Sequence, residues 1–270
     1  MSVSHCSRRQ FVGTALTTSV ITIGGLVTPA FAAVESICRF TLVQSIALPI
    51  DSAHIKNDFE RNLSRILQII EKHATPYDWL AFDDAPLTGH AAGLLPATDV
   101  SLGDDDLKRL TSAALHHRCW ISLGAVRRSY DSILVLSPQG QLFEWPMPPR
   151  HAPLPLTGRV PKRDLTLPIV VVDDRRIAVT PMDVTAKFSA ECIDRGVDIM
   201  ITMNSSSGCV TPPTTQAAPS LSMNVHAAAP WQPPGCDTRG LGRSRVLNVR
   251  GEVIAECPTA DEHVLVLAGL

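Results

Sequence analysis

Cysteine thiols are the reactive side chains whose positions say most about this chain. Of the seven cysteines, Cys6 lies in the leading segment and six lie beyond it. Cys209 and Cys236 stand in Ser-, Gly- and Pro-rich stretches (SSSGC and PPGC), which are typical of loops. An even number of cysteines in an oxidising compartment permits disulfides. We predict a Cys209–Cys236 bridge, which would close a loop of about 27 residues and contribute roughly 3 kcal/mol.

The remaining thiols and the histidines indicate no metal or cofactor site. Four cysteines lie in or next to apolar periodic segments, where buried free thiols are expected: Cys38, Cys119, Cys192 and Cys257. No CxxC pair and no Cys/His zinc spacing occurs. His116 and His117 are adjacent on an expected helix end, and neighbouring helical residues do not converge on one ligand. We therefore predict neither a metal nor a cofactor.

The first 32 residues read as an export signal. Arg8-Arg9 precede a weakly apolar run from Phe11 to Val27, and Ala30-Phe31-Ala32 offers a small-x-small cleavage site. The run is diluted by glycine and threonine, which suits the twin-arginine route for folded proteins. We predict cleavage after Ala32, a mature domain of residues 33–270, and a periplasmic or extracellular location. The alternative is a short N-terminal helix that happens to contain Arg-Arg.

Composition limits the classes of partner. Hydrophobic residues make up 45% of the chain, enough for one sizeable core. Removing the signal takes two arginines and no acid, which changes the formal net charge from −2 to −4. Without a basic stripe, nucleic acid is excluded as an expected partner. No later apolar run approaches the ~20 residues that span a bilayer. A small molecule or a protein remains as the expected partner.

Hydrophobic periodicity predicts alternating strands and helices, an α/β architecture with a mixed sheet. Apolar residues recur at helical spacing from Ile55 to Ile70, and Pro76 ends that helix. Two further helices are predicted, from Asp104 to about His117 and from Val184 to Arg195. The predicted strands are 40–48, 78–82, 119–125, 131–136, 141–145, 167–172, 177–180, 198–203, 221–225, 244–249, 252–255 and 264–268.

Four stretches resemble the nitrilase superfamily of carbon–nitrogen hydrolases, in the order found there. They are DWLAFDDAPLTG (78–89), ISLGAVRRSYDSILVLSPQG (121–140), IAVTPMDVTAKFSAECIDRGVDI (177–199) and SRVLNVRGEVI (244–254). The likeness covers nearly the whole mature chain. It implies a four-layer α-β-β-α sandwich of nitrilase type. Because members usually pair through their helices, it also implies a homodimer.

The resemblance also implies a Cys-Glu-Lys triad, in which a thiolate attacks, a carboxylate moves the proton and a lysine steadies the oxyanion. The glutamate position falls on Asp84, whose side chain is one methylene shorter. The cysteine position falls on Pro181, which has neither a nucleophile nor an N–H. The lysine position, about eight residues after Gly140, is unfilled. Arg150 and Lys162 are the nearest cations in the Pro-rich stretch.

The residues flanking those positions leave two interpretations open. On the family's pattern Asp83, Asp84 and Asp183 would gather at one pocket mouth, with Thr180 and Met182 beside the nucleophile position. In the first interpretation the aspartates form a repurposed acidic site that binds a cation or an amine. In the second they have no ligand, and their carboxylates accept hydrogen bonds from the backbone and from the N-termini of helices. Substitute nucleophiles (Cys192, Cys209 or Thr180) would need a different register or an activating base. Arg127-Arg128 stand where the family often has a second carboxylate.

Three functional hypotheses follow. In the first, the chain is a degenerate relative that keeps the fold, has lost the triad and acts by binding. In the second, it is an active amide or nitrile hydrolase whose nucleophile lies elsewhere. In the third, the aspartates support a different enzyme class, with or without a metal. The first is favoured because the cysteine and the lysine are both missing and the glutamate is shortened.

Overall fold

The computed structural model describes ten ranges of the chain, all within the compact unit Val34–Leu270 that is separate from Met1–Ala33. The described residues are 37, 39–48, 50–51, 53–88, 101–128, 130–147, 166–181, 190–204, 219–228 and 242–268. Several predicted features lie outside these ranges: the signal segment, Cys38, Arg150, Lys162, Met182, Asp183, Cys209 and Cys236.

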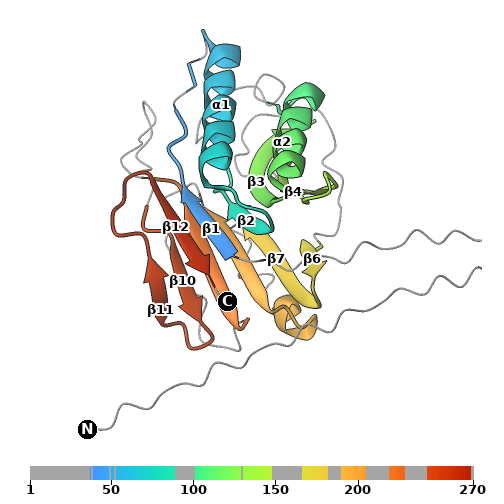
Figure 1. Ribbon diagram of the computed structural model, residues 1–270, viewed down its shortest axis with the longest axis vertical. Coiled ribbons are helices and arrows are strands. Elements are labelled where there is room, and N and C mark those ends of the chain that lie inside the picture. Colours follow the sequence, from blue (N-terminus) through green and yellow to red (C-terminus); the bar gives the residue numbers. More distant parts are fainter. Residues whose placement is uncertain are drawn as a thin grey trace, which may run out of the picture. The chain divides into compact units, whose positions relative to one another are not determined.

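The first of two mixed sheets has the strand order β12-β1-β2-β3-β4-β5 (Figure 1). β1, β2 and β3 run parallel, and the other neighbours pair antiparallel. The strands are β1 (Arg39–Gln44), β2 (Asp78–Ala81), β3 (Trp120–Arg127), β4 (Tyr130–Leu136), β5 (Leu142–Pro146) and β12 (His263–Ala268).

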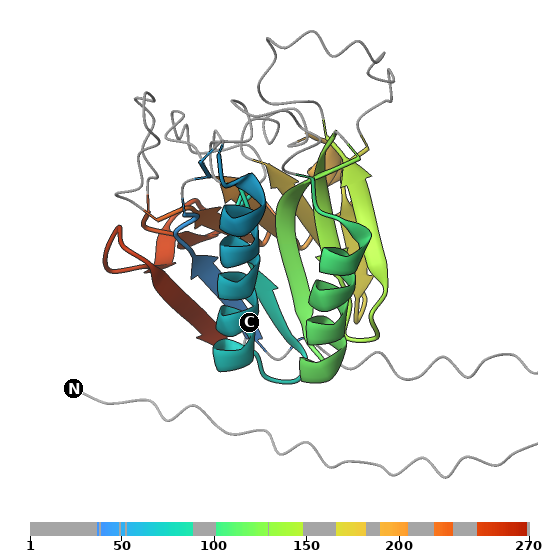
Figure 2. The same ribbon diagram turned by 90° about the horizontal axis from the view of Figure 1, so that it is seen from above.

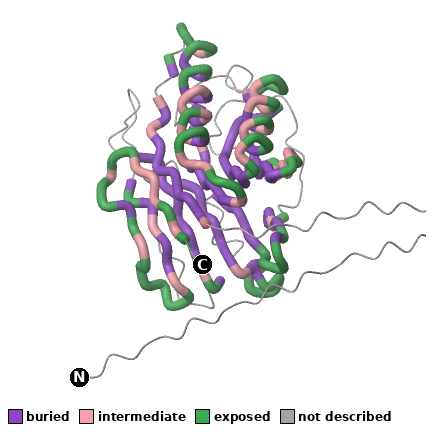
Figure 3. Tube along the Cα trace, viewed as in Figure 1, coloured by how far each residue is buried: buried purple, intermediate pink, exposed green. Residues whose placement is uncertain are grey.

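The second sheet has the order β11-β10-β9-β8-β7-β6. Its central strands β7, β8 and β9 are parallel, and each flank is an antiparallel hairpin. The strands are β6 (Ile169–Val172), β7 (Arg175–Pro181), β8 (Ile199–Asn204), β9 (Leu221–His226), β10 (Arg245–Asn248) and β11 (Val253–Glu256). The strands buried on both sides are those near the middle of each sheet, whereas β11 is exposed (Figure 3).

One apolar layer, called here the inner layer, fills the space between the two sheets. Alternate residues of the strands supply it, such as Leu42 from β1 and Val179 from β7. Trp79 and Trp120 stack within it with ring centroids 5.3 Å apart. The indole N–H of Trp79 donates to Ser122 Oγ at 2.9 Å, so the buried ring leaves no polar atom unpaired.

Helices cover the outer faces of both sheets, which confirms the predicted α-β-β-α order of layers. α1 (Ile55–His73) and α2 (Asp104–His117) lie side by side on the first sheet (Figure 2). Their apolar stripes pack on the strand residues that point away from the inner layer. On the second sheet, the described helical residues 190–194 pack Cys192 against Ala178 and Met200. No helix among the described residues is long and apolar enough to cross a membrane.

The element boundaries agree with the sequence predictions to within a few residues. α1 ends at His73 before Pro76, and α2 begins with three aspartates at its positive end. The largest difference is at β1, which ends at Gln44 rather than at residue 48. The Ser45 carbonyl there accepts a hydrogen bond from Ala228 N–H, just after β9, at 3.0 Å. The chain leaves the first sheet at that point because its next backbone partner belongs to the second.

Gly124 permits the close approach of β3 to the segment that follows β2. A Cβ added at this position would lie 2.6 Å from Asp84 Cα and would overlap the Asp84 carbonyl. The Gly124 N–H donates to the Asp83 carbonyl at 3.2 Å, and Phe82 N–H donates to the Ser122 carbonyl at 2.9 Å. The two aspartates after β2 are therefore held against β3 by backbone contacts that only glycine leaves room for.

We expect Gly124→Ala to lower the free energy of unfolding by about 3 kcal/mol, because the new methyl group meets backbone rather than a movable side chain. Urea denaturation of the purified chain measures the change. Gly103→Ala is the matched control: a Cβ there meets only the Asp106 carboxylate at 3.3 Å. The control should lose under about 1 kcal/mol, and equal losses in both variants would contradict the close-approach argument.

Candidate functional site

The carboxyl ends of the parallel strands of both sheets meet at one edge of the sandwich. The Ala228 to Ser45 hydrogen bond joins the end of β9 to the end of β1, and β2, β7 and β8 run parallel to these strands. We call this the strand-end region. Such an edge is where ligands usually bind in α/β folds.

Asp83 has a structural role in the strand-end region. Its side chain accepts hydrogen bonds from Ser45 Oγ at 3.2 Å and from Ala85 N–H at 2.8 Å. The residue is 1% exposed. One carboxylate thus ties β1 to β2 and closes a turn at its own position. This arrangement supports the second interpretation of the aspartates, that of carboxylates bound to backbone, for Asp83.

Asp84 lies where the triad carboxylate was predicted, immediately beyond β2. It is 8% exposed, and its backbone is fixed by the contact with Gly124. A carboxylate kept nearly out of water on a fixed backbone is suited to binding a cation or an N–H donor.

Asn62 on α1 supports the loops around these aspartates, and the sequence analysis assigned it no role. Its amide nitrogen donates to the carbonyls of Leu48 at 3.0 Å and Leu87 at 2.8 Å, and its oxygen accepts from Leu48 N–H at 2.8 Å. The side chain is buried, at 1% exposure. A polar residue on the otherwise apolar face of the predicted helix was the signal that could have indicated this role.

Pro181 is the last residue of β7, where it pairs with Met203 of β8. The ring lacks both a nucleophilic atom and an N–H, so this strand end can neither attack a substrate nor donate an oxyanion hydrogen bond from its own amide. Thr180 precedes it and is completely buried. The structure therefore brings Thr180 and Pro181 to the strand-end region. Met182 and Asp183 lie outside the described residues.

The predicted lysine position is filled by apolar residues as far as it is described. Trp145 ends β5 with Pro146, and both Trp145 and Met147 pack against the inner layer. The Met147 N–H donates to the Asp131 carbonyl at 2.6 Å, which holds this segment against β4. No ammonium group can come from residues 145–147.

The three described cysteines are buried free thiols, as predicted. Burial raises the pKa of Cys119 to about 12, with the nearby Asp78 carboxylate adding to the effect. Burial likewise raises the pKa of Cys192 and of Cys257 to about 11 in each case. Because the thiolate is the nucleophile, these thiols are unreactive near neutral pH. Cys192 is also packed among apolar side chains, away from the end of β7.

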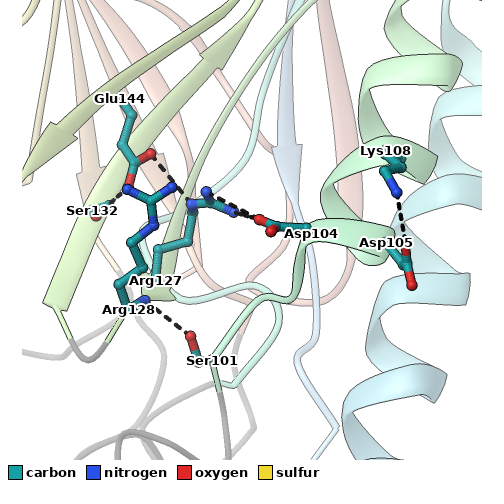
Figure 4. A network of polar contacts seen from close by, with 8 residues as sticks. All are labelled: Ser101, Asp104, Asp105, Lys108, Arg127, Arg128, Ser132 and Glu144. Carbon is teal, nitrogen blue, oxygen red and sulfur yellow. Dashed lines mark hydrogen bonds and ion pairs between the residues drawn. The ribbon is translucent and has the colours of Figure 1, made fainter.

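A buried arginine lies at the end of β3, where the family pattern often has an acid. The Arg127 side chain is 4% exposed, and its Nε lies 3.3 Å from Glu144 Oε2 (Figure 4). Its terminal nitrogens donate to Asp104 Oδ1 at 3.4 and 3.5 Å, and Ser132 Oγ donates to Glu144 at 3.4 Å. Arg127 thus links β3 to β5 and to the start of α2. The sequence analysis did not identify Glu144 as its partner.

These positions together define which groups the described part of the strand-end region contains. Among the described residues no group of three or more His, Cys, Asp or Glu side chains is placed to hold a metal ion. The strand-end region contains a buried carboxylate at Asp84 and polar side chains such as Asn204. Neither a reactive thiol nor an ammonium group accompanies them in the parts of the chain that are described.

Comparisons with known proteins agree with this architecture. No protein-family profile and no curated protein sequence matches the chain. Solved structures of amidases from Nesterenkonia do match. A mutant of the Nesterenkonia AN1 amidase from the nitrilase superfamily has a TM-score of 0.64 at 16% identity, covering 86% of this chain and 90% of that one.

Two further Nesterenkonia amidase structures give similar values. One has a TM-score of 0.61 at 15% identity, covering 86% of this chain and 90% of the amidase. A double mutant in complex with acrylamide has a TM-score of 0.61 at 16% identity, covering 90% and 92%. Together with the two helix-covered sheets, these likenesses show that the chain has the fold of nitrilase-superfamily amidases.

Proposed function

We propose that this protein is an exported binding protein built on the nitrilase fold, without the Cys-Glu-Lys chemistry. The observation that carries the proposal is Pro181 at the last position of β7, where the resemblance puts the nucleophile. The buried, high-pKa thiols of Cys119, Cys192 and Cys257 support it, since none can replace the missing thiolate. The binding partner is a small molecule or a protein, and a homodimer is the expected assembly.

Asp84 is the residue that we propose contacts the ligand. It is the acid on the family's glutamate position, it is nearly buried, and Gly124 fixes its backbone. In an environment of low dielectric, a carboxylate interacts strongly with a charged or N–H-bearing partner. An amine or amide is therefore the ligand chemistry that fits best.

The second candidate function is carbon–nitrogen hydrolysis with a displaced nucleophile. It is favoured by the surviving acid at Asp84 and by the likeness to amidases, one of which was found with acrylamide added at its active-site cysteine. The thiol would have to come from Cys38, Cys209 or Cys236, which lie outside the described residues.

Export is part of the proposal and rests on the sequence alone. The twin arginine, the diluted apolar run and the cleavage motif at Ala30-Phe31-Ala32 support it. The proposed location is periplasmic or extracellular, with residues 33–270 as the mature domain.

The first prediction concerns catalysis. The purified mature protein should show no rapid stoichiometric labelling by iodoacetamide at neutral pH, and no ammonia release from acetamide, acrylamide or simple nitriles. Mass spectrometry and an ammonia assay measure these two results. Labelling in denaturant, where the burial effect on the thiol pKa is lost, is the positive control for alkylation.

Fast labelling of a single thiol, together with ammonia release, would instead support the displaced-nucleophile hypothesis. Serine variants then identify the thiol. Loss of both labelling and activity in Cys209→Ser or Cys236→Ser, but not in Cys192→Ser, would show that binding alone does not describe the function.

The second prediction concerns export. Replacing both Arg8 and Arg9 with lysine should leave the precursor unprocessed inside a host that has the twin-arginine route, whereas the wild-type chain should appear outside the cytoplasm beginning at Ala33. Cell fractionation and N-terminal sequencing measure this. Arg39→Lys, beyond the predicted cleavage site, is the matched control and should be exported normally. Export of the double-lysine variant at the wild-type level would contradict the assignment.

A further inference from the structure

A row of polar side chains crosses the outer face of the second sheet, the face opposite the inner layer. Thr180 of β7 lies beside Thr202 of β8, Thr202 beside Asn224 of β9, and Asn224 beside Arg245 of β10. We call these four residues the polar row. Their strand neighbours point to the inner layer, so the register puts all four on one face.

Three more polar residues lie next to the polar row on the same face. Asn204 pairs with His226 at the ends of β8 and β9, and Ser222 lies two residues before Asn224. All three are 2–3% exposed. A buried sheet face is normally apolar, as Ala178 and Met200 are further along this same face. The polar composition therefore requires an explanation.

Several polar atoms of this face are buried without a partner. Thr202 Oγ1, Ser222 Oγ, His226 Nδ1 and Arg245 Nε have no hydrogen bond in the structure. Thr202 is 1% exposed and His226 is 3% exposed. Native proteins rarely leave such atoms unsatisfied, so a cluster of them calls for an explanation, and a bound ligand is one that would satisfy them together.

The charge on this face indicates which kind of ligand could satisfy these atoms. Arg245 is half-buried and always cationic, and the described residues show no ion pair for it. Glu256 is the residue of β11 that pairs with Arg245. It is exposed and makes no ion pair with Arg245. Burial, together with the Arg245 charge, lowers the pKa of His226 to about 4, so the imidazole is neutral at physiological pH. A half-buried cation among neutral hydrogen-bonding groups favours an anion.

We propose that the polar row and His226 form a binding site for a small oxyanion, a carboxylate or a phosphate. The Arg245 guanidinium supplies the charge-assisted hydrogen bond, and the Thr202 hydroxyl and the Asn224 amide donate beside it. His226 and Ser222 border the site. This site uses the outer face of the second sheet and does not depend on the proposed function at Asp84.

The experiment titrates sodium acetate and sodium phosphate separately into the purified chain at constant ionic strength in a chloride-free buffer. Isothermal calorimetry and the melting temperature are the readouts, and the shift of the His226 ring in NMR spectra reports on the site. Saturable binding of at least one anion should raise the melting temperature. In Arg245→Gln and in Thr202→Val the Kd should rise about tenfold. The two arms distinguish carboxylate from phosphate.

Two matched controls separate specific binding from general salt stabilisation. Thr41→Val removes another buried, unpartnered hydroxyl, in the first sheet, and Arg250→Gln removes an exposed guanidinium from the β10–β11 hairpin. Both controls should bind as the wild type does. Absence of saturable binding, or equal anion effects in all five proteins, would overturn the proposal. If Arg245→Gln does not fold, the Kd of Thr202→Val is compared with that of Thr41→Val. A higher Kd in Thr202→Val alone, together with the His226 shift, supports the proposal, and equal Kd values overturn it.

Discussion

The inner layer between the two sheets is the constraint on which the rest of this structure depends. Alternate residues of the strands in both sheets are apolar and face it, so a shift by one residue in any central strand would exchange the side chains that fill this layer with those of the opposite face. The register fixed in this way brings the ends of β1 and β9 within hydrogen-bonding distance. The strand-end region forms because both sheets pack against the same inner layer, which holds their strand ends side by side.

Within that framework, the chemistry available at the strand ends is set by a few side chains. Pro181 ends β7 without a nucleophile. Trp145 and Met147, where the resemblance places a lysine, pack against the inner layer. Asp83 holds β1 to β2, and the nearly buried Asp84 is the acid that we propose contacts the ligand. In the binding function proposed above, the strand-end region selects its ligand by charge and hydrogen bonding, because a fold does not fix the chemistry of its site.

The sequence was sufficient to predict the elements because their signals are local, whereas the order of the layers was predicted from the resemblance to the nitrilase superfamily. The 3.6-residue period from Ile55 to Ile70 and the Ser137–Gly140 turn each needed only a short window. The sequence was insufficient for contacts between distant residues. Asn62 reaching Leu87, Glu144 meeting Arg127, and the register that aligns Thr202 with Asn224 depend on tertiary packing, which no local pattern encodes.

The pairing of β1 with β12 has a consequence for how the chain matures. Arg39 lies opposite Ala268, so the earliest strand of the first sheet finds one of its two neighbours only when the last strand has been made. Until β12 has been synthesised, one edge of β1 has unpaired N–H and C=O groups that can pair with a strand of another chain. The first sheet can therefore be completed only after residues 263–268 have left the ribosome.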